Sequence, residues 1–431
     1  MSTAPGFGPV HRRARRRGAR LRAGILAIAI VGALVSAAGG YTAYAFSLPL
    51  PAIAPEVQPR SAVTTPAAEV ALPGYGAAAI GEQDAPGSAL AGGDLDTPRP
   101  IASITKVVTA LVVLDARPIE GDGPGESITL TAEDAQRVAD YRAIVGVVAP
   151  APVGATVSQR EVIQLMLVHS ANNYADTLAA WAFGSVEAYV EAARVWLDEN
   201  GLDGITVADA TGFATESAGT PRALLDLARL ALADPVISAA AALPAVEVPG
   251  IGRFETRNPV LGQDGITGLK TGTTNAAGSC LLFTAVVDRD GEQVRLVGVV
   301  LGGPSGAVVG GDVRALLTSA LDDYRTVQIA ADDELVARYE APWGDTAELR
   351  VAESAAAMTW GAATSSSLIP APRLQAGRTP RAEDMIVQFG EEQLRVGLEW
   401  SGSIQAPDLE WRLQQPLRFW GLLPAEDARA G

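Results

Sequence analysis

The chain has 431 residues, 48% of them hydrophobic and 19% charged, which fits a packed protein of two or three domains. Its formal net charge is −16 at pH 7, and outside one arginine-rich segment no basic patch is visible, so the sequence argues against nucleic-acid binding by the main body. The single cysteine, Cys280, also excludes a disulfide framework within the chain.

The N-terminal segment has the pattern of a membrane anchor. Residues 11–22 contain seven arginines and no acidic residue, and the next 24 residues, Ala23–Phe46, carry no charge. That length crosses a bilayer as a helix, with the arginines on the cytoplasmic side. We therefore expect a cytoplasmic tail at 1–22 and a transmembrane signal anchor at 23–46. A cleaved signal peptide, with Val35–Ala37 as its cleavage motif, is the alternative. Both readings place the remaining chain outside the cytoplasm.

Three regions follow the apolar segment. Residues 47–74 are rich in proline and alanine and predict an extended linker. Residues 75–328 mix helix and strand signals, which predicts the main domain. From 329 to 431, segments ending with "LEWRLQQP" alternate apolar and polar residues at period two, which predicts a β-rich accessory domain and tail.

Within the main domain, helix signals precede strand signals. One helix begins with "SQRE", where Ser158 and Glu161 form a capping box. The later strands are joined by short, turn-rich connections, which predicts antiparallel hairpins. The fold class expected is therefore α+β, with helices packed on an antiparallel sheet. The predicted helices are 103–115, 158–169, 173–183, 221–233 and 310–324, and the predicted strands are 268–273, 279–287 and 294–301.

Lysine is rare in this chain. Of the 33 basic residues, 31 are arginine and two are lysine, Lys106 and Lys270. Arginine keeps its proton in proteins, whereas burial or a nearby cation can make lysine lose its proton. Both lysines are therefore candidates for proton chemistry.

The sequence offers little support for zinc-dependent catalysis or for a nucleophile turn of the α/β-hydrolase type. The two histidines are His11 and His169, and the first lies in the predicted tail, so no usual zinc site is available and no cofactor is expected. A G-x-S-x-G turn is absent as well. If the protein is a serine enzyme, a lysine becomes the candidate base.

Three short motifs bring hydroxyls, an amide and the lysines together. In "SITK", Ser103 and Lys106 share the first turn of a buried helix, where Ser103 is a candidate nucleophile and a neutral Lys106 its base. In "SAN", Ser170 and Asn172 lie in a break between helices, where capping is the simpler interpretation. In "KTGT", Lys270 offers a cation on a strand edge, although a hairpin lysine alone would be unremarkable. Thr271, Gly272 and Thr273 complete that edge as candidate substrate-binding residues.

The order and spacing of the motifs resemble a known family. "SITK", "SAN" and "KTG" follow one another at intervals of 67 and 100 residues. This trio is similar to that of penicillin-binding proteins and serine β-lactamases. The flanking sequence, from about residue 75 to 326, resembles the low-molecular-mass D-alanyl-D-alanine carboxypeptidases.

The resemblance implies a function. Ser103 would be acylated, with Lys106 as base and Ser170 in proton transfer, while Asn172, Lys270 and Thr271–Thr273 bind substrate. Backbone N–H groups of Ser103 and Thr273 would hold the oxyanion. The implied reaction removes the terminal D-alanine of a peptidoglycan stem peptide, with β-lactam antibiotics as covalent inhibitors.

The chain also departs from the resemblance. Relatives often carry a basic residue in the loop that here reads "GGPSGAVVGG", Gly302–Gly311, which has no charge. This puts strict carboxypeptidase specificity in doubt. The C-terminal "RFWGLLPAEDARAG" is short and acidic, unlike the amphipathic helix that anchors some relatives to the membrane. We therefore expect the N-terminal helix to be the membrane anchor.

Two rival functions stay open. A class A β-lactamase uses a glutamate in an E-x-x-x-N pattern, and no such pattern lies between Asn172 and Lys270. A non-catalytic cell-wall-binding scaffold of the same fold would not need the intact serine–lysine pairs. Loss of function on replacing Ser103 separates enzyme from scaffold.

Overall fold

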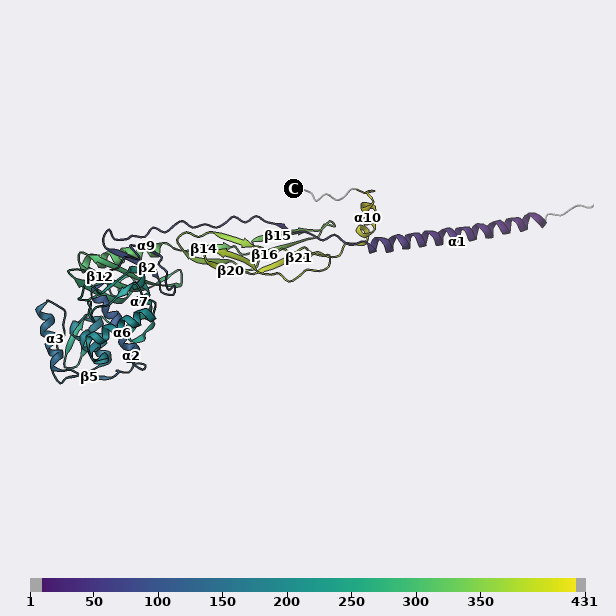
Figure 1. Ribbon diagram of the computed structural model, residues 1–431. Coiled ribbons are helices and arrows are strands. Elements are labelled where there is room, and N and C mark those ends of the chain that lie inside the picture. Colours follow the sequence, from purple (N-terminus) through teal and green to yellow (C-terminus); the bar gives the residue numbers. More distant parts are fainter. Residues whose placement is uncertain (1–9, 424–431) are drawn as a thin grey trace, which may run out of the picture. The chain divides into compact units, whose positions relative to one another are not determined.

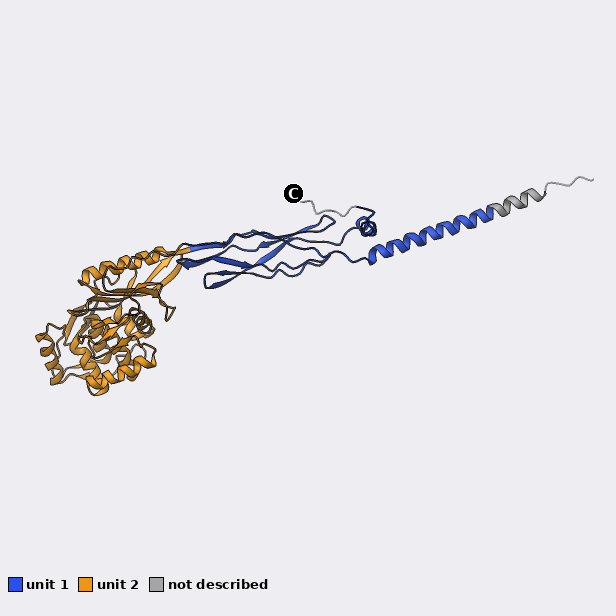
Figure 2. Ribbon diagram, turned by 45° about the horizontal axis from the view of Figure 1, so that its top comes forward, with its two compact units in different colours: residues 1–65, 326–431 blue, residues 66–325 orange. Residues whose placement is uncertain are grey.

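The computed structural model describes residues 10–423 and divides the chain into two compact units. Residues 66–325 form the mixed unit, and residues 1–65 with 326–431 form the β-rich unit (Figure 2). Parts of the expected cytoplasmic tail and of the expected C-terminal tail lie outside the described residues.

The N-terminal apolar segment forms one continuous helix, α1 (Val10–Ser47). Its stretch Arg20–Ser47 contains an 18-residue window with a mean hydropathy of 2.1 and is long and apolar enough to cross a membrane. A membrane anchor and a signal sequence share these properties, so both interpretations of the segment remain.

A five-stranded antiparallel sheet forms the centre of the mixed unit, in the order β11-β12-β13-β2-β3. Three of these strands cover the predicted hairpin strands, and β11 lies at one edge of the sheet. The strands are β11 (Ile266–Thr274), β12 (Gly278–Arg289), β13 (Glu292–Gly303), β2 (Ala77–Glu82) and β3 (Ala91–Gly93).

Helices cover both faces of this sheet. On one side α9 (Gly306–Asp322) packs on β12 and β13, and on the other α7 (Pro221–Ala233) packs against β13 and β2 (Figure 1). The remaining helices are η1 (Ala102–Ile104), α2 (Thr105–Ala116), α3 (Ala132–Ala143), α4 (Gln159–Val168), α5 (Asn172–Phe183), α6 (Val186–Glu199) and α8 (Pro235–Ala241). Short strands lie between them, in a three-stranded sheet of order β4-β8-β7 and in the pairs β5–β6 and β9–β10. They are β4 (Arg99–Pro100), β5 (Ser127–Thr129), β6 (Thr156–Ser158), β7 (Ile205–Thr206), β8 (Ala218–Gly219), β9 (Ala245–Val248) and β10 (Gly252–Glu255). The predicted α+β class, with helices on an antiparallel sheet, is confirmed.

Local signals explain where the helices around the motifs begin and end. Ser158 accepts from the backbone N–H of Glu161, whose carboxylate accepts from the N–H of Ser158, so the predicted capping box is present. The helix α4 that follows ends at Val168, which leaves the "SAN" motif in the break before α5.

The β-rich unit contains three small antiparallel sheets around its own apolar core. The β-type alternation predicted after residue 329 is therefore confirmed for most of this region. Its strands are β1 (Glu56–Val57), β14 (Tyr324–Ala330), β15 (Leu335–Glu340), β16 (Thr346–Val351), β17 (Ala355–Trp360), β18 (Ser365–Leu368), β19 (Met385–Phe389), β20 (Glu392–Val396) and β21 (Leu398–Gly402).

The segment expected as an extended linker is in part a component of the sheets: β1 pairs with β15, and Ile53 forms a bridge with Leu374. An unpaired sheet edge attracts a neighbouring extended segment, which explains the pairing. The segment "LEWRLQQP" is not a strand but lies in helix α10 (Leu409–Phe419), where Asp408 caps the N-terminus by accepting from the N–H of Trp411.

Candidate active site

Ser103 lies on the short helix η1, immediately before α2. The preceding residue, Ala102, has φ = 48°, a left-handed conformation that is costly for a residue with a side chain. Ser103 is half-buried at this turn, whereas the first two turns of α2 are fully buried. The turn thus presents a serine hydroxyl at the surface of a buried helix.

Lys106 reaches Ser103 from the first turn of α2. Its Nζ donates to Ser103 Oγ at 2.9 Å, to Asn172 Oδ1 at 2.7 Å and to the carbonyl oxygen of Thr211 at 2.7 Å. The side chain has no exposed surface. Three acceptors therefore hold the amine in one place, and one of them is the candidate nucleophile.

Burial lowers the pKa of Lys106 to about 7, against an ordinary value of 10.5, while the carboxylates of Asp209 and Asp176 act in the opposite direction. Burial also lowers the pKa of Lys270, and the charges of Lys106 and Arg257 lower it further. A substantial neutral fraction of Lys106 exists at neutral pH and can accept a proton.

Ser170 and Lys270 form a second buried pair. Lys270 Nζ donates to Ser170 Oγ at 2.9 Å and to the carbonyl oxygen of Thr271 at 2.8 Å. Ser170 has φ = 66°, so the break between α4 and α5 holds its hydroxyl in a strained backbone conformation. Asn172, two residues later, bonds Lys106, so the "SAN" break contacts both lysines.

The "KTGT" segment lies on β11 beside the Ser103 turn. A Cβ added to Gly272 would lie 2.9 Å from Ser103 N and 2.9 Å from the carbonyl oxygen of Ile101. Among the described strands, β11 pairs only with β12, which leaves its outer edge available. Thr273 is exposed near that edge, and its hydroxyl donates to the carbonyl oxygen of Gly272 at 2.8 Å. An extended peptide can pair with such an edge.

All eight predicted site residues therefore lie in two adjacent groups, one around Lys106 and one around Lys270. A comparison of the sequence with models of known protein families gives a match. A family model described as D-alanyl-D-alanine carboxypeptidase matches residues 75–305, more than half of the chain. The chain belongs to this family, peptidase family S11.

Individual relatives agree with the family. D-alanyl-D-alanine endopeptidase of Escherichia coli strain K12 is 30% identical over 207 residues, covering 45% of this chain and 61% of the relative. The enzyme of the same description from Pseudomonas aeruginosa is 31% identical over 205 residues, covering 44% of this chain and 60% of the relative. The chain thus spans about six-tenths of the length of the curated relatives it matches.

Solved structures show the same fold. The Streptomyces K15 DD-transpeptidase superposes with a TM-score of 0.51 at 20% identity, covering 60% of this chain and all of that one. A serine-to-alanine variant of the same enzyme gives a TM-score of 0.51 at 21% identity, with 60% of this chain and 99% of that chain covered.

The candidate site has a half-buried polar support that the motifs alone did not reveal. Asp209 accepts from the backbone N–H groups of Gly212, Phe213 and Ala214, and also from the hydroxyls of Thr211 and Ser217. This closed turn fixes the Thr211 carbonyl that bonds Lys106. Gly212 has φ = 78°, and a Cβ there would lie 1.8 Å from the carbonyl oxygen of Ala102. The turn that Asp209 closes therefore packs directly against the backbone that precedes Ser103.

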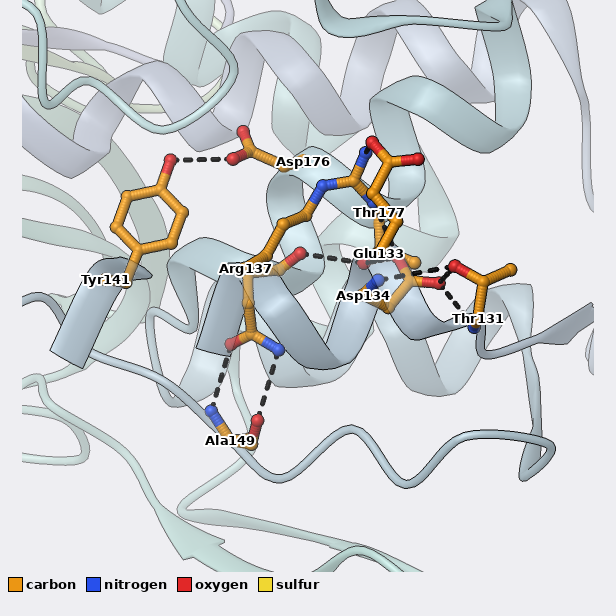
Figure 3. A network of polar contacts seen from close by, with 9 residues as sticks. Thr131, Glu133, Asp134, Arg137, Tyr141, Ala149, Asp176 and Thr177 are labelled. Atoms are coloured by element: carbon orange, nitrogen blue, oxygen red, sulfur yellow. Dashed lines mark hydrogen bonds and ion pairs between the residues drawn. The ribbon is translucent and has the colours of Figure 1, made fainter. Parts of the chain in front are cut away.

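A second support lies at the start of α5, where Figure 3 shows polar contacts between α3 and α5. Tyr141 Oη donates to Asp176 at 2.7 Å, and Thr177 Oγ1 donates to Asp134 at 2.6 Å. Burial raises the pKa of Asp176 to about 6, although its hydrogen bond to Tyr141 opposes this. The amide of Asn173, beside Asn172, exchanges two hydrogen bonds of 3.1 Å with the backbone of Ala149. These contacts fix the first turn of α5, which carries Asn172.

Sequence reasoning missed Asp209, Thr211 and Asp176. The only available signal for the first was an aspartate three residues before a glycine in "DATG", which is typical of a turn. His169, the remaining histidine, packs on Phe254 with ring centroids 4.7 Å apart and takes no part in either lysine group. Among residues 10–423, no group of three or more His, Cys, Asp and Glu residues could hold a metal ion.

Replacing Asp209 by asparagine should slow acylation about 100-fold, because a misplaced catalytic group costs that order of rate. The substitution also removes a negative charge that raises the pKa of Lys106. We therefore expect the acid limb of the kcat/KM profile to move to lower pH, which is measured by acylation kinetics between pH 5 and 9. Asp203→Asn, at an exposed aspartate nearby, is the matched control and should change neither rate nor profile. An unchanged profile in Asp209→Asn would contradict the link to Lys106.

Replacing Gly272 by alanine should reduce activity about 100-fold, because the added methyl would push β11 away from Ser103 N by several tenths of an ångström. Thermal unfolding monitored by circular dichroism should move to a lower temperature, because two of the contacted atoms belong to the backbone, but the protein should stay folded since β11 keeps its pairing with β12. Gly311→Ala, where an added Cβ meets nothing, is the control. Equal activity in the two variants would show that the approach of β11 to Ser103 does not matter.

Proposed function

We propose that the protein is a serine-type D-alanyl-D-alanine peptidase that acts on peptidoglycan stem peptides through an acyl-enzyme on Ser103. The observation that carries this proposal is the hydrogen bond from the buried Lys106 amine to Ser103 Oγ, at 2.9 Å. Membership of the S11 family supports the substrate class, and the pKa of Lys106, about 7, supports its role as base.

In the acylation step, neutral Lys106 takes the proton of Ser103 Oγ while that oxygen attacks the carbonyl carbon of the penultimate D-alanine. The tetrahedral oxyanion is held by the backbone N–H groups of Ser103 and Thr273, on the two elements that Gly272 allows to approach. Ser170, bonded to Lys270, delivers a proton to the departing amine, and the proton that Lys106 took from Ser103 replaces it, so that Lys106 is neutral again. Water then attacks the ester carbonyl and neutral Lys106 takes a proton from that water. This proton passes to Ser103 Oγ as the ester bond breaks.

The substrate is an extended peptide paired with the outer edge of β11. Asn172 accepts from Lys106 through Oδ1, and its Nδ2 would donate to the peptide backbone. Lys270, Thr271 and Thr273 provide the polar groups of the strand edge. β-Lactams present a strained amide with a nearby carboxylate and should acylate the same serine.

Two specificities fit this site: carboxypeptidase activity on a terminal D-alanine and endopeptidase activity on cross-links. Carboxypeptidase activity is the function expected from the sequence resemblance and is the family description. Endopeptidase activity is favoured by one observation, the uncharged loop Gly302–Gly311, which includes the start of α9 and offers no cation for a terminal carboxylate. The curated relatives are described as endopeptidases, which supports keeping this second candidate.

The protein is proposed to be anchored by α1 with its peptidase unit outside the cytoplasm. The apolar stretch Arg20–Ser47 and the preceding arginines support this topology. The alternatives are a secreted form after cleavage, a non-catalytic scaffold and a serine β-lactamase.

The test compares two substrates with the purified full-length protein in detergent. One is a stem pentapeptide ending in D-Ala-D-Ala, and the other is a cross-linked muropeptide dimer. Release of D-alanine from the pentapeptide would support the carboxypeptidase, and cleavage of the dimer alone would support the endopeptidase. Rapid turnover of penicillin, with neither peptide cleaved, would identify a β-lactamase. A folded protein that cleaves nothing and forms no penicillin adduct would overturn the enzymatic proposal.

A further inference from the structure

Helix α10 lies against the C-terminal end of the apolar helix α1. Tyr41 Oη donates to the carbonyl oxygen of Leu413 at 2.7 Å, and the rings of Tyr44 and Trp420 stack with centroids 5.6 Å apart. Both tyrosines belong to the last two turns of α1. The contact is therefore made where α1 would leave the hydrocarbon core if it crosses a membrane.

The residues that follow α1 are held by the same helix. Arg412 Nη1 donates to the carbonyl oxygen of Leu48 at 3.0 Å, and its guanidinium lies 5.5 Å from the centroid of the Phe46 ring. Gln415 Nε2 donates to the carbonyl oxygen of Pro49 at 2.9 Å. These bonds link α10 to the exit of α1 through both side chains and backbone.

Apolar side chains remain exposed around this contact. We call them the collar: Tyr44, Phe46, Phe419, Trp420 and Leu422. Phe419 is 72% exposed, Leu422 68% and Trp420 51%, so these side chains are left to solvent by the protein itself. A group of exposed aromatic and aliphatic side chains is typical of a surface that binds a membrane or another protein.

The β-rich unit is connected to the other side of α10. The rings of Trp411 and Trp343 lie edge to face with centroids 5.2 Å apart. Trp343 Nε1 also donates to the carbonyl oxygen of Gln405 at 3.1 Å. Helix α10 thus contacts both the end of α1 and the loops of the small sheets.

We propose that the collar lies in the headgroup region of the lipid bilayer that α1 spans, so that α10 fixes the base of the β-rich unit at the membrane surface. Two observations favour lipid as the material that covers the collar. The collar continues directly from the apolar surface of α1, and tyrosine and tryptophan prefer the boundary between lipid and water. The proposal rests on the proposed membrane topology and does not depend on the proposed peptidase activity.

The test measures the depth of single labelled positions in the full-length protein reconstituted into phosphatidylcholine–phosphatidylglycerol vesicles. Cys280 is the only cysteine and is buried, so Cys280→Ser gives the background. A fluorophore is attached in the variants Phe419→Cys, Leu368→Cys and Val31→Cys, and lipids carrying nitroxides at shallow or deep positions act as quenchers. Leu368, on β18, is 72% exposed like Phe419 and is the matched control.

The expected result is that shallow nitroxides remove most of the fluorescence at position 419, deep nitroxides do so at position 31, and neither affects position 368. Position 419 behaving like position 368 would overturn the collar while leaving the anchor in place. No quenching at position 31 would overturn both the anchor and the collar. Disulfide formation between two chains at position 419, without quenching, would identify the collar as a dimer contact and also overturn the proposal. Peptide cleavage measured in the same vesicles reports on the peptidase separately.

Discussion

Replacing Ser103 by alanine should abolish covalent labelling by a fluorescent penicillin and reduce peptide cleavage by about 10⁴-fold or more, because the proposed mechanism places the acyl group on Ser103 alone. Labelling is followed on a denaturing gel, and cleavage by the release of product from the preferred peptide substrate. In the wild-type protein, mass spectrometry of the digested adduct should place the penicilloyl group on the peptide that contains Ser103.

Ser170→Ala is the matched control for this variant. Ser170, like Ser103, is a serine bonded to a buried lysine at 2.9 Å, so the two substitutions remove the same kind of group. In the proposed mechanism Ser170 moves a proton and carries no acyl group, so its loss slows acylation yet leaves a labelled band after long incubation. A band that persists in Ser103→Ala but disappears in Ser170→Ala would mean that Ser170 carries the acyl group and Ser103 moves the proton. Circular dichroism of both variants excludes unfolding as the cause.

One contact of the candidate site could be predicted from the sequence because it is local. Ser103 and Lys106 are three residues apart at a helix start, so their contact follows from helix geometry. The contact between Lys106 and Asn172 spans 66 residues, and only the family resemblance made it predictable. The Thr211 carbonyl was missed because a main-chain acceptor leaves no signature in the residue type.

The errors outside the site also have physical reasons. The residues Leu409, Trp411 and Leu413 alternate with polar ones, as on a strand, but Leu409, Leu413 and Pro416 equally fit the spacing of a helix face. The capping interaction of Asp408, the hydrogen bond from Tyr41 to the carbonyl oxygen of Leu413 and the stacking of Trp420 on Tyr44 favour the helix. The pairing of β1 with β15 depends on an edge formed far along the chain, which local composition does not record.

Replacing Lys106 by arginine should reduce the acylation rate about 10³-fold, within the range expected for loss of a general base. Arginine retains a positive charge and hydrogen-bond donors, but it cannot give up its proton to become a base. The measurement is the second-order rate constant of penicillin acylation, which reports the attack of Ser103 without a peptide leaving group. Lys270→Arg is the matched substitution at the other buried lysine. It retains a cation beside the strand edge, so we expect a smaller loss, mainly in peptide KM.

The pH dependence of the wild-type enzyme gives an independent check on the same residue. Because burial lowers the pKa of Lys106 to about 7, the amine is protonated below that pH and cannot accept the Ser103 proton. The acylation rate should therefore fall about tenfold per pH unit well below pH 7 and level off above pH 8. In Lys106→Arg this limb should disappear from the residual rate, because no titrating base remains at that position. A limb with the same midpoint in both proteins would assign the titration to another group, and Asp176, whose pKa burial raises to about 6, would then be the group to replace.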